Sequence, residues 1–364
     1  MISSIIKVII LCGGFEMQHK LTPGPLLDEQ GKLCECGYAT SLVKQYDRNA
    51  IKAPKFRIKE WDYYLITAND FAFAMTIDDN SYMGQESASV LDFTDKDNPW
   101  EHTSGIIKFF TNGKIGMPST SEIGDVAYDS KKVKLKVTND GKTRHLTCHY
   151  KNFDGKNDLD MDIVLTDFPE DSMVAAVPWK NHPRHFYYNQ KIIGMKATGT
   201  VAFRGKTYTL DESNNAFGLL DWGRGVWTYD NTWYWGAGQT RLPDGHTFGF
   251  NIGYGFGDTS AASENMLFYD GKAHKLEEVS FNIPKTADGK DDFMAPWTFT
   301  SSDGRFEMDF IPILDRAANI TVGPLGSDQH QVFGHFSGTA ILDDGTKLEI
   351  KDMLGFAEKV RNKW

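Results

Sequence analysis

Glycine alternates with large apolar residues between Thr247 and Gly257, in the run TFGFNIGYGFG. Side chains alternate between the two faces of a β-strand, so this run predicts a strand with one aromatic face and one nearly bare face. Glycine inside a strand costs roughly 0.5–1 kcal/mol relative to alanine and is typical of places where another group approaches the backbone. That group is either a ligand, with Asn251 as its polar contact, or another sheet that closes a barrel.

Strand patterns also recur elsewhere, at residues 61–66, 71–77, 132–138 and 160–166. Turn sequences such as Asn139-Asp140-Gly141 separate them. Amphipathic helix patterns are scarce: Thr259 to Met266 fits a short turn, and Asp352 to Arg361 fits a brief closing helix. We therefore predict an all-β chain with few short helices.

A faint internal repeat suggests two copies of one β module. Its first echo pairs Trp61-x-Tyr63, Phe71-x-Phe73 and Ser87-Ala88-Ser89 with Trp233-x-Trp235, Phe248-x-Phe250 and Ala261-Ala262-Ser263. Its second pairs Gly199-Thr200-Val201-Ala202-Phe203 with Gly338-Thr339-Ala340-Ile341-Leu342. At 364 residues the chain is also long for a single core. We predict two β-barrels packed side by side, over residues 54–211 and 212–364, after an extended lead-in over residues 1–53.

Charge and cysteine content narrow the class of protein. The chain has 39 basic and 49 acidic residues, a formal charge of −10 and an isoelectric point near 5.5. Nucleic-acid phosphates need clustered Lys and Arg, so we expect no nucleic-acid partner. Four cysteines are too few for a disulfide framework, and no stretch is long enough to cross a bilayer. We predict a cytoplasmic protein that is not integral to a membrane.

The first 16 residues allow three interpretations. One is that Met1 is a misassigned start and that translation begins at Met17, because Gly13-Gly14 can be encoded by a bacterial ribosome-binding sequence. The second is a structured segment. The third is a signal peptide, although the short apolar run lacks a small-x-small cleavage site.

The block Asp221-Trp222-Gly223-Arg224-Gly225 is the first candidate for chemistry. Asp221 follows two leucines and is expected to be partly buried, so its carboxylate needs a partner, and Arg224 is the nearest cation. The pair is either structural, at a strand end, or part of a pocket in which Asp221 donates or accepts a proton.

Other candidates surround this block. Trp222, Trp233 and Trp235 belong to a dense aromatic cluster that is either core or the lining of a pocket for an apolar ligand. Further candidates for ligand contact are Tyr187, Tyr254, Glu264 and Asn265, although capping is an alternative role for the last two.

A polar segment from Asn181 to Gln190 supplies the remaining candidates. His182 and His185 could move protons near neutral pH, and Arg184 could hold an anionic group. His-x-x-His without helical spacing or a third ligand does not predict a metal site. Nucleotide-binding and serine-hydrolase signatures are missing, so we expect no cofactor.

The central block, together with Asn251-x-Gly253-x-Gly255-x-Gly257-Asp258, Glu264-Asn265, the segment KFRIKEWDYY (55–64) and Gly355-Phe356-Ala357-Glu358, resembles a bacterial family of domains of unknown function, DUF family 2804. The resemblance covers nearly everything after about residue 22. It implies a bacterial protein.

That family is distantly similar to two-barrel, lipocalin-like proteins that include carotenoid hydratases, tocopherol cyclases and certain Diels–Alderases. Their motif aspartate corresponds to Asp221, although here Asp and Trp are adjacent and Arg224-Gly225 is added. The resemblance implies two calycin-type barrels and an apolar ligand cavity with cofactor-free proton-transfer chemistry.

Three functions follow from these features. The first is a hydratase, cyclase or isomerase that acts on a hydrophobic small molecule through Asp221, assisted by Arg224 and by His182 or His185. The second is a carrier that binds a lipid-like or aromatic ligand without turnover. The third is a scaffold whose aromatic residues are all core. The sequence does not indicate an oligomeric state.

Overall fold

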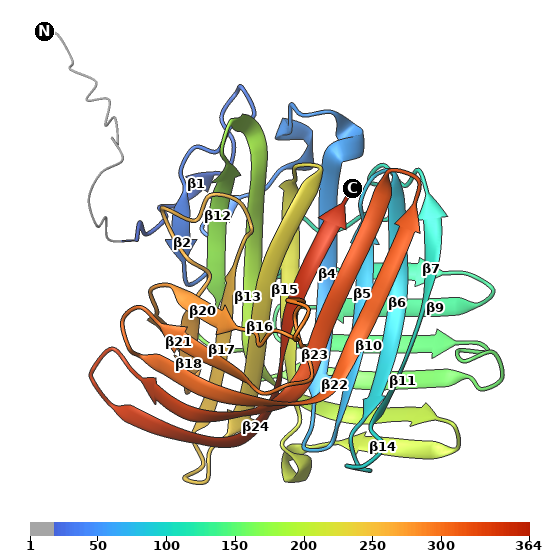
Figure 1. Cartoon of the computed structure of the whole chain (residues 1–364). Helices are drawn as coiled ribbons and strands as arrows, with labels where there is room; N and C mark the ends of the chain where they lie inside the picture. Colours follow the sequence, from blue (N-terminus) through green and yellow to red (C-terminus); the bar gives the residue numbers. More distant parts are fainter. Residues whose placement is uncertain (1–17) are drawn as a thin grey trace, which may run out of the picture.

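The computed structural model describes residues 18–364, in which two large antiparallel sheets lie side by side (Figure 1). The sequence alternatives for Met1 to Glu16 fall outside these residues. The first sheet has 13 strands: β2 (Gly37–Ala39), β4 (Ile58–Thr67), β5 (Phe71–Asp79), β6 (Met83–Asp92), β7 (Trp100–Phe109), β8 (Val126–Asp129), β9 (Val133–Asn139), β10 (Arg144–Tyr150), β11 (Leu159–Thr166), β12 (Met173–Trp179), β13 (His182–Phe203), β14 (Lys206–Leu210) and β15 (Phe217–Val226).

The second sheet has nine strands, in the order β19-β18-β17-β16-β24-β23-β22-β21-β20. Their bounds are β16 (Asp230–Arg241), β17 (Thr247–Tyr254), β18 (Met266–Tyr269), β19 (Lys272–Lys275), β20 (Val279–Asn282), β21 (Trp297–Ser301), β22 (Phe306–Val322), β23 (Leu325–Ile341) and β24 (Lys347–Lys363). Outside both sheets, β1 (Gly24–Pro25) pairs with β3 (Lys44–Gln45) in the lead-in segment.

The all-β prediction is confirmed, and the curled sheets are consistent with two lipocalin-like barrels. In residues 18–364 the only helices are the short 3-10 turns η1 (Arg48–Ala50), η2 (Lys55–Arg57) and η3 (Glu212–Asn214). None of the described helices is long and apolar enough to cross a membrane. The division of the chain at residues 211 and 212 stays a prediction, while the change from the first sheet to the second comes between β15 and β16.

The closing helix predicted over Asp352 to Arg361 is wrong, because these residues belong to β24. Ala357 packs into the core of the second sheet, whereas Leu354 and Phe356 pack between the sheets. A strand buried on both faces loses the simple alternation that identifies strands, and its apolar spacing resembles that of a helix.

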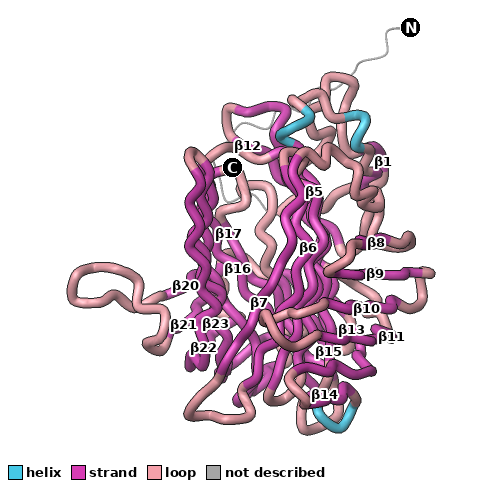
Figure 2. The backbone as a smooth tube through the Cα atoms, turned by 90° about the vertical axis from the view of Figure 1, so that its right-hand side faces the viewer, coloured by secondary structure: helices cyan, strands magenta, loops and turns pink. Residues whose placement is uncertain are grey.

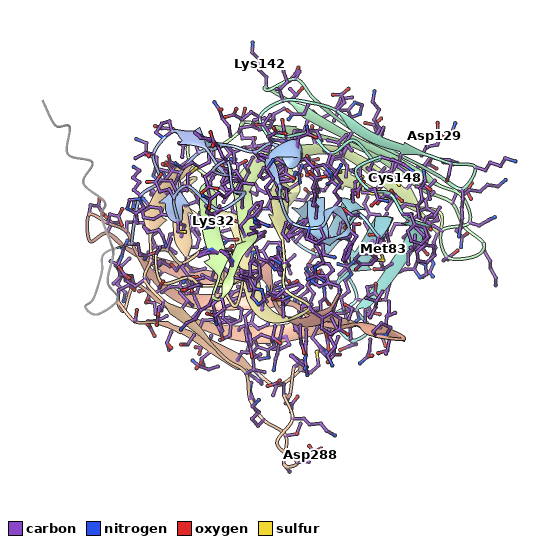
Figure 3. The ribbon with its side chains drawn as sticks, turned by 90° about the horizontal axis from the view of Figure 1, so that it is seen from above. Lys32, Met83, Asp129, Lys142, Cys148 and Asp288 are labelled. Carbon is purple, nitrogen blue, oxygen red and sulfur yellow. The ribbon has the colours of Figure 1, made fainter. Side chains whose placement is uncertain are left out.

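Three hydrophobic cores follow from this arrangement. One fills the first sheet, the second fills the second sheet, and a third lies between them and draws on both. Figure 2 shows β22 and β23 on one side of the molecule and β9 and β10 on the other, with β5 and β6 between them. Seen from above, Lys142 and Asp288 mark opposite ends of the molecule, and side chains fill the space between (Figure 3).

Another sheet does pack against the glycine face of β17 at Gly249, but it is the first sheet rather than one that closes the same barrel. A Cβ added at Gly249 would lie 2.6 Å from Ile193 Cγ2 of β13. A Cβ at Gly257, just beyond β17, would lie 2.6 Å from the carbonyl oxygen of Pro178. The glycines therefore allow the two sheets to approach each other closely.

The second sequence echo occupies matching places in the two sheets. Gly199 of β13 and Gly338 of β23 have φ angles of +137° and +156°, and a Cβ at either would collide with a carbonyl oxygen of the preceding partner strand. After this glycine each strand turns back and pairs with the next strand along the chain, the short β14 or the much longer β24. This correspondence supports two copies of one module.

Candidate functional site between the two sheets

Strand alternation places a set of polar and aromatic side chains on the face of the first sheet that meets the second. On β15, Asp221 points to this face, and its direct ladder partners are Lys191 of β13 and Tyr63 of β4. Trp61 of β4 and Tyr187 of β13 share the face, because they lie an even number of residues from Tyr63 and Lys191.

The second sheet contributes side chains by the same rule. Glu358 of β24 has Trp235 of β16 and Gln331 of β23 as ladder partners. Trp233 and Asn251 lie on this face too. We define the interface site as Trp61, Tyr63, Tyr187, Asn189, Lys191, Asp221, Trp233, Trp235, Asn251, Glu264, Gln331 and Glu358.

A buried ion pair between Asp221 and Lys191 lies at the centre of the interface site. The Lys191 side chain is 1% exposed, and its Nζ lies 4.3 Å from the centroid of the Trp235 ring. The indole Nε1 of Trp61 donates a hydrogen bond of 3.2 Å to Asp221 Oδ2. These contacts fix the carboxylate of Asp221 in a buried setting.

Two glutamates from the second sheet flank this pair. Burial raises the pKa of Glu264 to about 7, although the nearby Lys191 and a hydrogen bond from Asn189 oppose the shift. Burial likewise raises the pKa of Glu358 to about 7, against hydrogen bonds of 3.0 Å from Trp233 Nε1 and 3.1 Å from Gln331 Nε2. Both carboxyls can therefore exchange a proton near neutral pH.

Several interface-site groups have capacity for a further contact. Glu264 Oε2 and Asn189 Oδ1 are buried and have no hydrogen-bond partner among residues 18–364. Trp61, Tyr63 and Trp233 retain partly accessible surfaces although they lie between the sheets. Two surface hollows, of about 280 and 330 Å³, lie elsewhere, beside Gly194 and beside Tyr229.

The predicted pair of Asp221 and Arg224 does not form. Residues an odd number apart on a strand point to opposite faces. Trp222 and Arg224, one and three residues after Asp221, therefore enter the core of the first sheet. There the Arg224 guanidinium pairs with Asp62 at 3.0 Å and lies over the Trp222 ring. It also donates to the carbonyl oxygens of Trp61 and Pro118, at 2.7 and 2.8 Å.

His182, Arg184 and His185 lie at the start of β13, away from the interface site. His182 stacks on His185, and Arg184 Nε donates to the carbonyl oxygen of Gln30. Burial, with the charges of His182 and Arg57, lowers the pKa of His185 to about 4. Six residues separate His185 from Lys191, which is about 20 Å along an extended strand.

Tyr254 and Asn265 also lie outside the interface site. Tyr254 stacks on Tyr234 in the second core, with 4.6 Å between ring centroids. Asn265 accepts a hydrogen bond from the backbone of Gly253 and donates one to the carbonyl oxygen of Glu277, which fits the structural alternative. Asn251 bonds Trp235 Nε1 and the Glu264 carbonyl, so it holds the wall of the interface site.

Six residues of the interface site were missed by sequence reasoning: Trp61, Tyr63, Asn189, Lys191, Gln331 and Glu358. Lys191 follows the predicted polar segment by one residue, and strand alternation with Tyr187 was the signal that could have placed it. Tyr63 and Glu358 fall in segments already noted for the resemblance, but their roles depend on ladder registers that join distant strands.

Known structures share this fold. A candidate AttH from Nitrosomonas europaea is 12% identical with a TM-score of 0.52, over 86% of this chain and 96% of that one. Kievitone hydratase from Nectria haematococca is 11% identical with a TM-score of 0.50, over 93% and 98%. At such identity the likeness concerns the fold alone. A comparison with curated proteins finds no significant match. Residues 17–364 match the domain of unknown function DUF2804, and the chain belongs to that family.

Proposed function

We propose that the interface site catalyses cofactor-independent proton transfer on a hydrophobic small molecule, as in hydration, cyclisation or isomerisation of an alkene. The observation that carries this proposal is the Asp221–Lys191 pair, enclosed between two sheets beside two glutamates whose pKa values are about 7. Carboxyls in different protonation states within one apolar site are the usual means of acid–base catalysis at neutral pH.

Each group has a role in a hydration. Neutral Glu264 or Glu358 donates a proton to one alkene carbon, and water adds to the other carbon while Asp221 accepts the proton that the water releases. Lys191 pairs with the Asp221 carboxylate, and Trp61 orients it by a hydrogen bond. The aromatic walls stabilise the cationic character that develops on the substrate. Transfer of a proton from Asp221 to the glutamate, through water, restores the starting state.

The hydratase among the structural neighbours fits this class, although its likeness concerns the fold alone. The carrier function remains the alternative, because the same aromatic walls would hold an apolar ligand without turnover. Arg224, His182 and His185 have no direct part in the proposed chemistry, since they lie outside the interface site.

The test uses an apolar extract of the host, incubated with the purified protein in D2O and analysed by mass spectrometry. Turnover predicts a compound that gains deuterium, with or without the mass of water, in the presence of the wild-type protein. The substitution Asp221→Asn should abolish the change while the protein stays folded by circular dichroism. His185→Ala is the matched control and should keep it. Full turnover by folded Asp221→Asn would exclude the proposal, and a bound but unchanged compound would favour the carrier.

A further inference from the structure

Three hydrogen-bond donors without acceptors lie at one end of the inter-sheet space. They are Lys59 Nζ, Trp227 Nε1 and Trp364 Nε1, all buried and without a hydrogen-bond partner within residues 18–364. We call this set the donor nook. A buried donor left unsatisfied costs about 1–3 kcal/mol, so three in one place call for an explanation.

The strand ladder explains why the donors lie together. Lys59 of β4 is the direct ladder partner of Gly225 of β15, so both would direct a side chain to the same face. Gly225 has none, and the indole Nε1 of Trp227 lies 3.2 Å from the position that its Cβ would take. The Trp364 ring completes the nook, with its centroid 4.2 Å from Lys59 Nζ and 5.8 Å from the Trp227 ring.

The charges around the nook favour an anion. Burial lowers the pKa of Lys59 well below its usual value, assisted by the nearby charge of Arg57, and an anion beside Nζ would oppose that shift. The facing acid is Asp78, and burial raises its pKa to about 8, which leaves it neutral near pH 7. The Tyr82 ring also contacts Lys59 Nζ, with its centroid at 4.2 Å.

We infer that the donor nook binds the carboxylate of an organic acid whose apolar body lies among the aromatic rings between the sheets. The carboxylate oxygens would accept hydrogen bonds from Lys59, Trp227 and Trp364 together. A competing account is that the rings of Tyr82 and Trp364 alone satisfy the amine through contacts with their π faces.

This site is separate from the acid–base centre. Asp221 pairs with Tyr63 and Gly225 pairs with Lys59, so four ladder positions, or about 13 Å, separate the two places along the strands. The inference therefore does not depend on turnover, and its test needs none.

The experiment follows the indole N–H resonances of 15N-labelled protein at pH 7 during titration with 4-phenylbutanoate, using 4-phenylbutanol as the neutral control. Trp227→Phe and Trp364→Phe assign two of the nine indole signals. We expect saturable downfield shifts of these two signals with the acid and none with the alcohol. Lys59→Met should weaken binding at least tenfold, and Lys180→Met, at an exposed lysine, should not.

Trp364→Phe provides a second, milder variant if Lys59→Met does not fold, because it removes one donor and keeps an aromatic ring. It should weaken the binding of 4-phenylbutanoate several-fold. The inference is overturned if the Trp227 and Trp364 signals stay unchanged at saturating acid, if the alcohol shifts them equally, or if the folded variants bind the acid as the wild type does.

Discussion

The two faces of β15 each carry a buried ion pair, and the pairs differ in their surroundings. Towards the core of the first sheet, Arg224 pairs with Asp62 and places its other donors on backbone carbonyl oxygens. Towards the second sheet, Asp221 pairs with Lys191 beside Glu264 and Glu358. The first cation is tied to the backbone and cannot lose its proton, whereas the second lies among groups that can exchange protons.

The surroundings of an ion pair therefore distinguish a structural pair from a reactive one more clearly than the types of its residues do. Both pairs are buried, and each combines a carboxylate with a cation. Only the inter-sheet pair has titratable neighbours with a pKa near neutral pH and partly accessible aromatic walls.

The substitution Asp62→Asn should cause the largest loss of stability. It leaves the Arg224 charge buried without its partner, and we expect a loss of about 3–5 kcal/mol in the free energy of unfolding. Urea denaturation at pH 7.5 measures it. Asp230→Asn, which removes an exposed pair with Arg361, is the matched control and should change little. A loss at Asp62 no greater than at Asp230 would contradict the structural role.

Asp221→Asn should cost less stability, about 1–3 kcal/mol. In this variant Lys191 keeps the Trp235 ring and the nearby carboxyl of Glu264 as partners. The same urea measurement applies. If this variant lost as much stability as Asp62→Asn, the distinction between the two faces would fail.

The flanking glutamates predict a pH dependence. Because their folded pKa of about 7 exceeds the ordinary 4.5, the folded state binds more protons between pH 4.5 and 7, and stability falls as pH rises through that window. Each group contributes up to about 1.4 kcal/mol per pH unit. Glu264→Gln should make the slope shallower, as measured by urea denaturation at several pH values. An unchanged slope would exclude a protonated Glu264.

The smallest effect is expected for His185→Ala. At pH 7.5 its imidazole is neutral in both the folded and the unfolded state, because its folded pKa is about 4. Stability and turnover should both remain near wild type. A loss of turnover comparable to that of Asp221→Asn would show that His185 takes part in the reaction after all.

Much of this arrangement could be predicted from the sequence. Alternation and turn residues gave the all-β class, and Asp221, Tyr187, Trp233, Trp235, Asn251 and Glu264 do meet between the sheets. Arg224 was misassigned because proximity in sequence outweighed the two-residue period of a strand. Lys191 could have been placed by its alternation with Tyr187 on one strand. Glu358 could not, since only the pairing of β24 with β16 and β23 brings it to the site.

Native mass spectrometry of protein purified from its host, with three forms compared, tests the central claim most directly. In Gly223→Ala, the added Cβ collides with the Trp61 ring and fills the inter-sheet face of β15. In Gly218→Ala, on the same strand, the Cβ lies 2.6 Å from Leu165 Cδ2 inside the first core. We predict a small molecule bound to the wild type and to Gly218→Ala and lost from Gly223→Ala. Retention by Gly223→Ala with loss from Gly218→Ala would place the ligand inside the first barrel and contradict the account.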